Sequence, residues 1–88
     1  MTQVTYTVLL SPAAEREWRK LPPPIHKRVS RALLTLEDTP RPPGVVKLSG
    51  STDRWRVRVG DYRIIYRIDD TARQVLILRI AHRRQAYR

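Results

Sequence analysis

Trp-Arg-Val-Arg-Val-Gly-Asp-Tyr-Arg-Ile-Ile-Tyr, residues 55–66, is the stretch that decides the fold of this chain. Its first five residues alternate strictly, so Arg56 and Arg58 fall on one face of a strand and the apolar side chains on the other. Gly60-Asp61 is a turn signal, and a second alternating run follows it. We therefore predict a β-hairpin in which Arg63 lies across from Arg56 and Arg58.

Further elements flank this hairpin on both sides. A strand is expected over 5–10, and Ser11-Pro12 then starts a helix, because Ser caps helices well and Pro suits the first helical position. The three prolines at 22–24 end that helix, and a single apolar stripe predicts a second helix over 24–37. The nearly apolar stretch 75–81 predicts a central strand.

The predicted order is β-α-α-β-β-β, in one domain that spans residues 1–88 and belongs to the α+β class. We expect an antiparallel sheet with the helical hairpin packed on one face. The other face must then carry the arginines of the β-hairpin together. Strand alternation thus predicts that arginines scattered along the sequence form a cluster.

Charge is the strongest feature of the composition. Eighteen Lys and Arg against eight Asp and Glu give a net charge of +10. Such a surface attracts nucleic acid, an anionic membrane or an acidic protein. Every cation in 51–88 is Arg, which suits bidentate phosphate contacts better than Lys does.

The residue types that are missing narrow the chemistry. There is no cysteine, which excludes disulfides and thiolate metal sites, and no apolar run approaches the length of a membrane span. Phosphate-binding glycine motifs and a serine triad are also missing. Asp69-Asp70 falls in a turn and is expected to form that turn, not to bind a metal ion. We expect a cytoplasmic protein with no metal or other cofactor and no membrane partner.

One constellation could carry chemistry, and it comprises Arg56, Arg58, Arg63, His82, Arg83 and Tyr87. Like charges this close are costly unless an anion neutralises them, which favours a phosphate site. The alternative is a solvated strand face with Asp53 or Asp61 as partners. His82 and Tyr87 are the candidates for proton transfer, since adjacent cations favour a neutral imidazole and a phenol can donate, accept or stack on a base.

These residues also resemble a known family. The resemblance is carried by Lys47-Leu48-Ser49-Gly50, by residues 55–66, by Ala81-His82-Arg83-Arg84 and by Tyr87-Arg88, and it is to the RelE/ParE toxin superfamily. The Lys20-Leu21-Pro22 junction fits as well, so nearly the whole chain is covered. RelE-like members are ribosome-dependent endoribonucleases that cut mRNA in the A site. ParE-like members poison DNA gyrase and generally lack the catalytic set.

The resemblance implies a RelE-like activity, because the catalytic positions of that branch are filled here. It implies 2′-hydroxyl attack that leaves a 2′,3′-cyclic phosphate. Arg56 and Arg58 stand where the best-known RelE has Lys, and Arg is a poor general base, so the proton-transfer role moves toward His82. The implied catalytic set is Arg58, Arg63, His82, Arg83 and Tyr87, and the implied RNA-binding set is Lys47, Arg56, Arg84 and Arg88.

Two other functions remain open at this point. One is a ParE-like gyrase inhibitor without catalysis, and the other is a basic RNA-binding module whose arginines only contact phosphate. The implied partners are the ribosome with its mRNA and a cognate acidic antitoxin that wraps the toxin. The toxin alone is expected to be a monomer, and to form a hetero-oligomer with the antitoxin.

Overall fold

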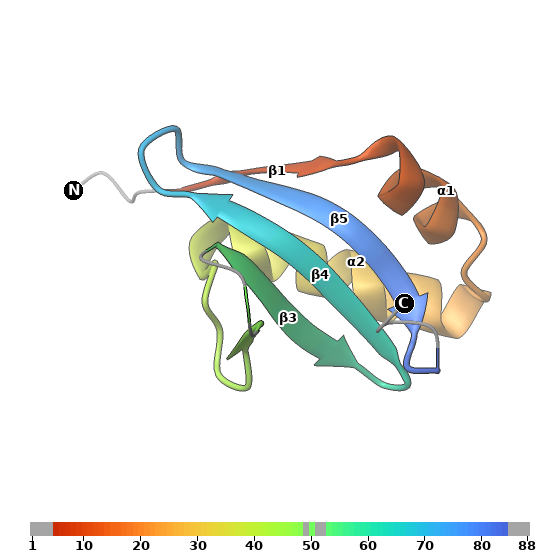
Figure 1. The fold of residues 1–88 in the computed structure, drawn as a ribbon. Helices are drawn as coiled ribbons and strands as arrows, with labels where there is room; N and C mark the ends of the chain where they lie inside the picture. The colour runs from red at the N-terminus through yellow and green to blue at the C-terminus, as the bar shows by residue number, and fades with distance from the viewer. Residues whose placement is uncertain (1–4, 49, 51–52, 85–88) are drawn as a thin grey trace.

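The computed structural model describes residues 5–48, 50 and 53–84. Its five-stranded sheet has the strand order β1-β5-β4-β3-β2, and two helices complete the domain. The predicted α+β class and helical hairpin are confirmed (Figure 1). The elements are β1 (Thr7–Leu10), α1 (Pro12–Arg19), α2 (Pro23–Asp38), β2 (Val46–Lys47), β3 (Arg54–Val59), β4 (Tyr62–Asp69) and β5 (Gln74–His82).

The sheet differs from the predicted one in two respects. β1 pairs with β5 in parallel, so the sheet is mixed and not wholly antiparallel. β2 was not predicted, because its two residues are too short to show any periodicity. The passage through both helices carries the chain across the sheet, so that β1 and β2 lie at opposite edges.

The two helices form where their caps and prolines place them. Ser11 caps α1, since its Oγ accepts a hydrogen bond from the N–H of Ala14 at 3.1 Å. α2 begins at Pro23, in the first turn where a missing N–H costs nothing. Trp18 Nε1 donates to Ser30 Oγ at 2.9 Å, which fixes one helix against the other.

The hydrophobic core lies between the helices and one face of the sheet. Figure 1 shows α2 running behind the strands, so the opposite face is turned toward the viewer. The helices contribute Ala14, Val29, Leu33 and Leu36, and the strands contribute Val59, Ile64, Tyr66, Ile68, Val75, Ile77 and Ile80. Burial of these side chains removes apolar area from water and is the main stabilising term of the fold.

The β3–β4 hairpin has the register that the sequence predicts. Arg58 pairs with Arg63, and Val59 pairs with Tyr62 across a two-residue turn. Gly60 has a φ of 59°, as the first central residue of a type II′ turn requires. This turn fixes the end of the sheet at which the site residues meet.

Within the described residues, neither helix is long and apolar enough to span a bilayer.

Candidate nucleic-acid interface

Arginines line the sheet face that the helices leave open. β3 places Arg54, Arg56 and Arg58 on this face, because alternate residues of a strand point the same way. Their partners on β4 are Arg67, Ile65 and Arg63, in that order. The predicted cluster is therefore present, as a double row along the β3–β4 hairpin.

The two ends of this double row differ in charge compensation. At the start of β3, Arg67 Nη2 lies 3.0 Å from Asp53 Oδ2, so that arginine is neutralised. At the turn end, Arg58 is exposed and makes no ion pair with any described residue. An anion therefore meets less competition beside Arg58 than beside Arg67.

Two hydrogen bonds of the Arg83 backbone place this residue at the turn end of the sheet. Arg63 Nη1 donates to the carbonyl oxygen of Arg83 at 2.9 Å. The N–H of Arg83 donates in turn to the carbonyl oxygen of Asp61 at 2.7 Å. These two bonds hold the turn after β5 against the β3–β4 turn, so Arg58, Arg63 and Arg83 gather at one end of the sheet. Arg84 follows and is exposed.

His82 lies at the same end of the sheet but on the other face. Its register partner is Tyr62, and the two rings meet edge-on with centroids 5.4 Å apart. Ala81, one residue earlier, is the partner of Arg63. Because neighbouring residues of a strand face opposite ways, the structure does not place the imidazole beside Arg58 and Arg63 as the constellation required.

Hydrogen bonding defines the orientation of the His82 ring further. The backbone N–H of Arg84 donates to Nδ1 of His82 at 3.3 Å. A neutral imidazole whose Nδ1 accepts carries its proton on Nε2. The ring therefore presents a donor, not an acceptor, at its outer nitrogen.

The remaining predicted residues are spread more widely. Lys47 in β2 pairs with Trp55 and holds its Nζ 5.8 Å from the centroid of that ring, on the helix-facing side. Arg56 lies on the open face between Arg54 and Arg58. Tyr87 and Arg88 lie outside the described residues.

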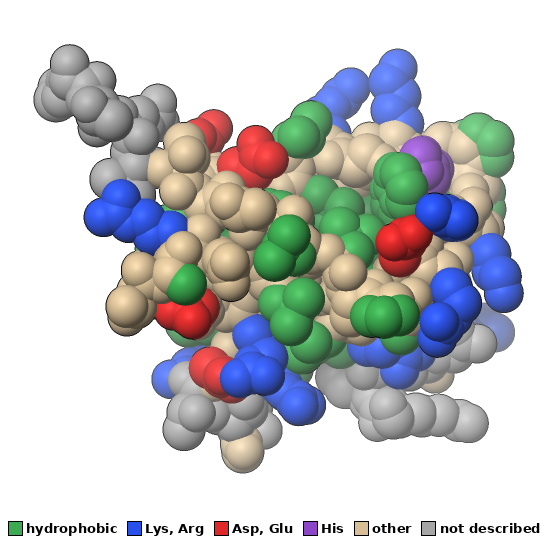
Figure 2. All heavy atoms as spheres, turned by 90° about the horizontal axis from the view of Figure 1, so that it is seen from above, with side chains coloured by type: hydrophobic (Ala, Val, Ile, Leu, Met, Phe, Trp, Pro, Cys, Tyr) green, Lys and Arg blue, Asp and Glu red, His purple; other side chains and the backbone are tan. Residues whose placement is uncertain are grey.

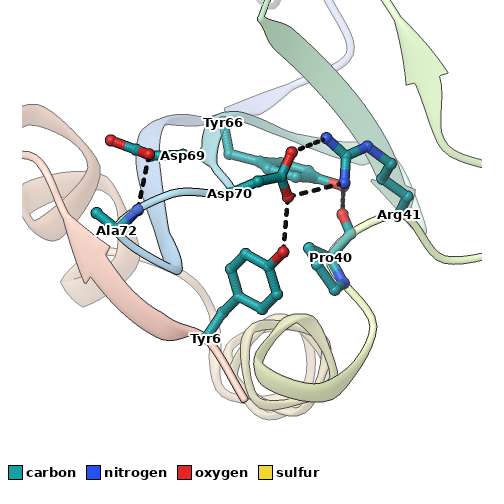
Figure 3. Close-up of polar contacts among 7 residues, drawn as sticks. All are labelled: Tyr6, Pro40, Arg41, Tyr66, Asp69, Asp70 and Ala72. Atoms are coloured by element: carbon teal, nitrogen blue, oxygen red, sulfur yellow. Dashed lines mark hydrogen bonds and ion pairs between the residues drawn. The ribbon is translucent and has the colours of Figure 1, made fainter. Parts of the chain in front are cut away.

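A polar network fixes the loop before β2 (Figure 3). Arg41 donates to both carboxylate oxygens of Asp70, at 3.2 and 2.9 Å, and Tyr6 Oη donates to Oδ1 at 2.6 Å. The guanidinium and the phenol lower the pKa of Asp70, and the bond to Asp70 raises the pKa of Tyr6. Tyr66 Oη donates to the carbonyl of Pro40 at 2.8 Å, and burial raises the pKa of Tyr66 to about 12. This network is structural and joins β1, the loop and the β4–β5 turn.

The acidic pair of that turn forms the turn, as the sequence indicated. Asp69 Oδ1 accepts the N–H of Ala72 at 2.9 Å, and Asp70 is occupied by Arg41 and Tyr6. Over the described ranges, no group of three or more His, Cys, Asp or Glu side chains is placed to hold a metal ion.

Sequence reasoning missed two cations that the fold brings near the site. Arg28 of α2 approaches the β3–β4 turn, with Nη1 3.1 Å from the position that a Cβ on Gly60 would take. Arg79 of β5 shares the open face with Ile65 and Arg56. The first depends on how α2 crosses the sheet and the second on the register of β5, and no local pattern encodes either one.

An apolar groove lies on a different side of the molecule, beside the edge strand β1. Figure 2 looks onto this side and shows hydrophobic side chains gathered around a central hollow, with Lys and Arg along the right-hand border. Leu34 is 62% exposed at the groove. The lining residues are Val8, Leu10, Trp18, Ser30, Leu33, Leu34 and Glu37.

Comparison with known proteins places the chain among bacterial and archaeal toxins. The family model for the ParE toxin of the parDE type II toxin–antitoxin system matches residues 8–87. Toxin RelG of Mycobacterium tuberculosis is 38% identical over 84 residues, which cover 94% of this chain and 97% of RelG.

Solved structures agree with this placement. The chain is similar to the toxin–antitoxin complex RelBE2 of Mycobacterium tuberculosis, with a TM-score of 0.79, 36% identity and coverage of 90% of this chain and 99% of that one. It is also similar to the archaeal RelE–RelB complex of Pyrococcus horikoshii, with a TM-score of 0.81, 31% identity and coverage of 93% and 99%. The chain therefore belongs to the RelE/ParE superfamily of type II toxin–antitoxin toxins.

Proposed function

We propose that this toxin is a ribosome-dependent endoribonuclease that cuts mRNA in the A site. The 2′-hydroxyl attacks the adjacent phosphorus, and the products carry a 2′,3′-cyclic phosphate and a 5′-hydroxyl. The observation that carries the proposal is the meeting of Arg58, Arg63 and Arg83 at the turn end of the sheet. A phosphodiester gains negative charge as it becomes pentacoordinate, and fixed cations stabilise that charge.

Each arginine takes a separate role in this proposal. Arg58 and Arg63 stabilise the phosphorane, and Arg83 holds the scissile phosphate. Arg56, Lys47, Arg84 and Arg88 contact the RNA on either side. No metal ion takes part in this scheme.

His82 and Tyr87 are the candidates for the proton-transfer role, and His82 fills it only if the RNA passes around the turn end to the face that carries its ring. The Nδ1 of His82 accepts from Arg84, so the outer Nε2 is a donor. A neutral ring of this tautomer can hydrogen-bond to a phosphate oxygen through Nε2. It becomes a general acid for the leaving 5′-oxygen only when Nδ1 is also protonated, which breaks the bond from Arg84. Comparing His82→Ala with Tyr87→Phe in single-turnover cleavage separates the two candidates.

Cleavage of mRNA on translating ribosomes tests the proposal. Arg63→Ala and Arg83→Ala should each slow cutting by roughly a hundredfold or more. Arg67→Ala is the matched control, because it removes an arginine from the same face at the end that Asp53 neutralises. Undiminished cutting in the Arg63/Arg83 double variant would overturn the proposal.

The alternative is gyrase inhibition without catalysis, and the match to the ParE family model supports it. In that case the chain would block supercoiling by gyrase and leave mRNA on ribosomes intact. Assaying the same preparation in both reactions separates the two functions.

We also propose an acidic antitoxin as the protein partner. Solved relatives are complexes with antitoxins, and a net charge of +10 favours an acidic segment. Apolar side chains of that segment would fill the groove beside β1. Leu34→Glu should release the product of an adjacent acidic reading frame on co-purification, and Thr35→Glu, at the next and exposed position of α2, should not.

A further inference from the structure

β1 covers only the first part of the outer edge of β5. β1 follows this edge only as far as the pairing of Leu10 with Ile77. β5 continues to His82 with no strand beside it on that side among the described residues. Strand residues beyond this point would leave backbone groups without partners, which is costly unless other groups supply them.

Side chains at and within α1 supply these partners. Ser11 Oγ donates to the carbonyl oxygen of Leu78 at 3.0 Å. Glu17 Oε1 accepts the N–H of Ile80 at 2.7 Å. The helix therefore holds the edge of β5 that the short β1 leaves open.

Glu17 makes a second contact with the same strand. Its Oε2 accepts from Nε of Arg79 at 2.9 Å and lies 2.8 Å from Nη2. The carboxylate raises the pKa of Arg79. One half-buried side chain thus binds two consecutive residues of β5, through the backbone of one and the guanidinium of the other.

This anchor lies next to the anion site in sequence and in space. Ala81 follows Ile80 and pairs with Arg63, and Arg83 is bonded to Asp61 through its N–H. The carbonyl of Arg83 also receives the guanidinium of Arg63. The C-terminal end of β5 is therefore held by α1 on one side and by the β3–β4 hairpin on the other.

We propose that Glu17 is a positioning residue of the anion site, acting through β5 on Arg83 and Arg63. The inference rests on the proposed endoribonuclease function. Glu17 does not touch the RNA, and it sets where the end of β5 places the arginines. Misplacement of such groups by about 1 Å can cost about a hundredfold in rate, so loss of the anchor should lower turnover more than ribosome binding.

The experiment compares Glu17→Ala with Glu15→Ala. Glu15 lies on the same helix and makes an exposed ion pair with Arg19 at 2.7 Å, so its loss removes a similar charge without touching β5. Glu17→Ala should lower the single-turnover cleavage rate at saturating toxin by about tenfold or more, with nearly unchanged affinity for the ribosome. Glu15→Ala should behave as the unmodified chain.

Two further variants distinguish positioning from a general loss of stability. Glu17→Gln keeps an oxygen acceptor for the N–H of Ile80, so it should recover part of the rate and also carries the test if Glu17→Ala does not fold. In a background that carries both Arg63→Ala and Arg83→Ala, Glu17→Ala should cost little more, because the two groups that it positions are already gone. Full additivity, or a rate equal to that of Glu15→Ala, would overturn the inference.

Amide hydrogen exchange keeps this test separate from the proposed function. Glu17→Ala should speed exchange at Ile80 and Arg83 and leave the amides of Ile64 and Tyr66 in β4 unchanged. If the unmodified chain cuts no mRNA, the endoribonuclease proposal fails, and faster exchange at Arg83 still supports the anchor. Unchanged exchange at Arg83 overturns the anchor whether or not the chain cuts.

Discussion

Gly60 combines two constraints in one residue. Its φ of 59° lies in the region that L side chains disfavour, and a Cβ would meet Nη1 of Arg28 at 3.1 Å. Because the guanidinium is the flexible end of its side chain, the contact would displace Arg28 more than it would distort the turn. The glycine therefore keeps the turn relaxed and also lets a cation of α2 approach the site.

Gly60→Ala should lower the free energy of unfolding by about 1–2 kcal/mol, mainly through the left-handed conformation. Gly44→Ala is the control, because Gly44 has a φ of 87° and open space around its Cβ position. Urea denaturation measures both variants. A loss for Gly44→Ala as large as that for Gly60→Ala would show that the contact with Arg28 is not an additional cost.

The raised pKa of Tyr66 predicts that the protein loses stability in alkali. Tyr66 is fully buried, and burial raises its pKa from 10.0 to about 12. The fold favours the neutral phenol, so this contribution is complete below pH 10 and is lost as the pH rises through about 12. Two pKa units correspond to roughly 3 kcal/mol.

Tyr66→Phe should remove most of this pH dependence between 10 and 12. It should also cost about 1 kcal/mol at neutral pH, because the variant cannot donate a hydrogen bond to the carbonyl of Pro40. Chemical denaturation at a series of pH values measures both effects. An unchanged alkaline slope would mean that other groups, not Tyr66, cause the loss of stability.

At the scale of elements, Ser11 is the joint between β1 and α1. Its hydroxyl accepts from the N–H of Ala14 and donates to the carbonyl of Leu78. Ser11→Ala should therefore destabilise the fold by about 1–2 kcal/mol, as the loss of a helix cap with a second bond would. Thermal unfolding should show little change for Thr35→Ala, whose exposed hydroxyl bonds only within α2.

The sequence was sufficient for elements whose contacts are local. The two-residue turn fixes the register of β3 and β4, so the pairing of Arg58 with Arg63 could be predicted. The place of β1 beside β5 could not, because Thr7 and Gln74 pair across nearly the whole chain. Parallel pairing of that kind depends on how the helices pack, and alternation in one strand carries no information about it.

In the candidate site, too, local contacts could be predicted from the sequence and long-range ones could not. Arg58 and Arg63 follow from the hairpin alone, whereas the face of His82 depends on the register between β4 and β5. That register contains an irregularity between Ile65 and Tyr66, which shifts the pairing along β5. Reading His82 as a neighbour of the arginines from sequence proximity to Arg83 therefore gave the right end of the sheet and the wrong face.

At the scale of the whole molecule, acidic side chains offset the described cations of the β3–β4 hairpin more fully at one end than at the other. Asp53, Asp69 and Asp70 surround Arg67 and line one pocket with it. No carboxylate forms an ion pair with Arg58 or Arg83 among the residues that the structure describes. The net charge of +10 is therefore unevenly distributed over the molecule, and its least compensated part lies at the β3–β4 turn.

This asymmetry predicts how RNA binding responds to salt. For single-stranded RNA, the slope of log K against log salt concentration changes by about 0.7 for each phosphate that the protein no longer neutralises. Arg58→Ala should reduce the slope by about that amount, since the guanidinium is available to a phosphate. Arg67→Ala should change it less, because Asp53 already neutralises this residue at 3.0 Å. Fluorescence anisotropy with a short oligouridylate at several salt concentrations gives both slopes. Equal reductions in the two variants would mean that RNA responds to total charge and not to the turn end of the sheet.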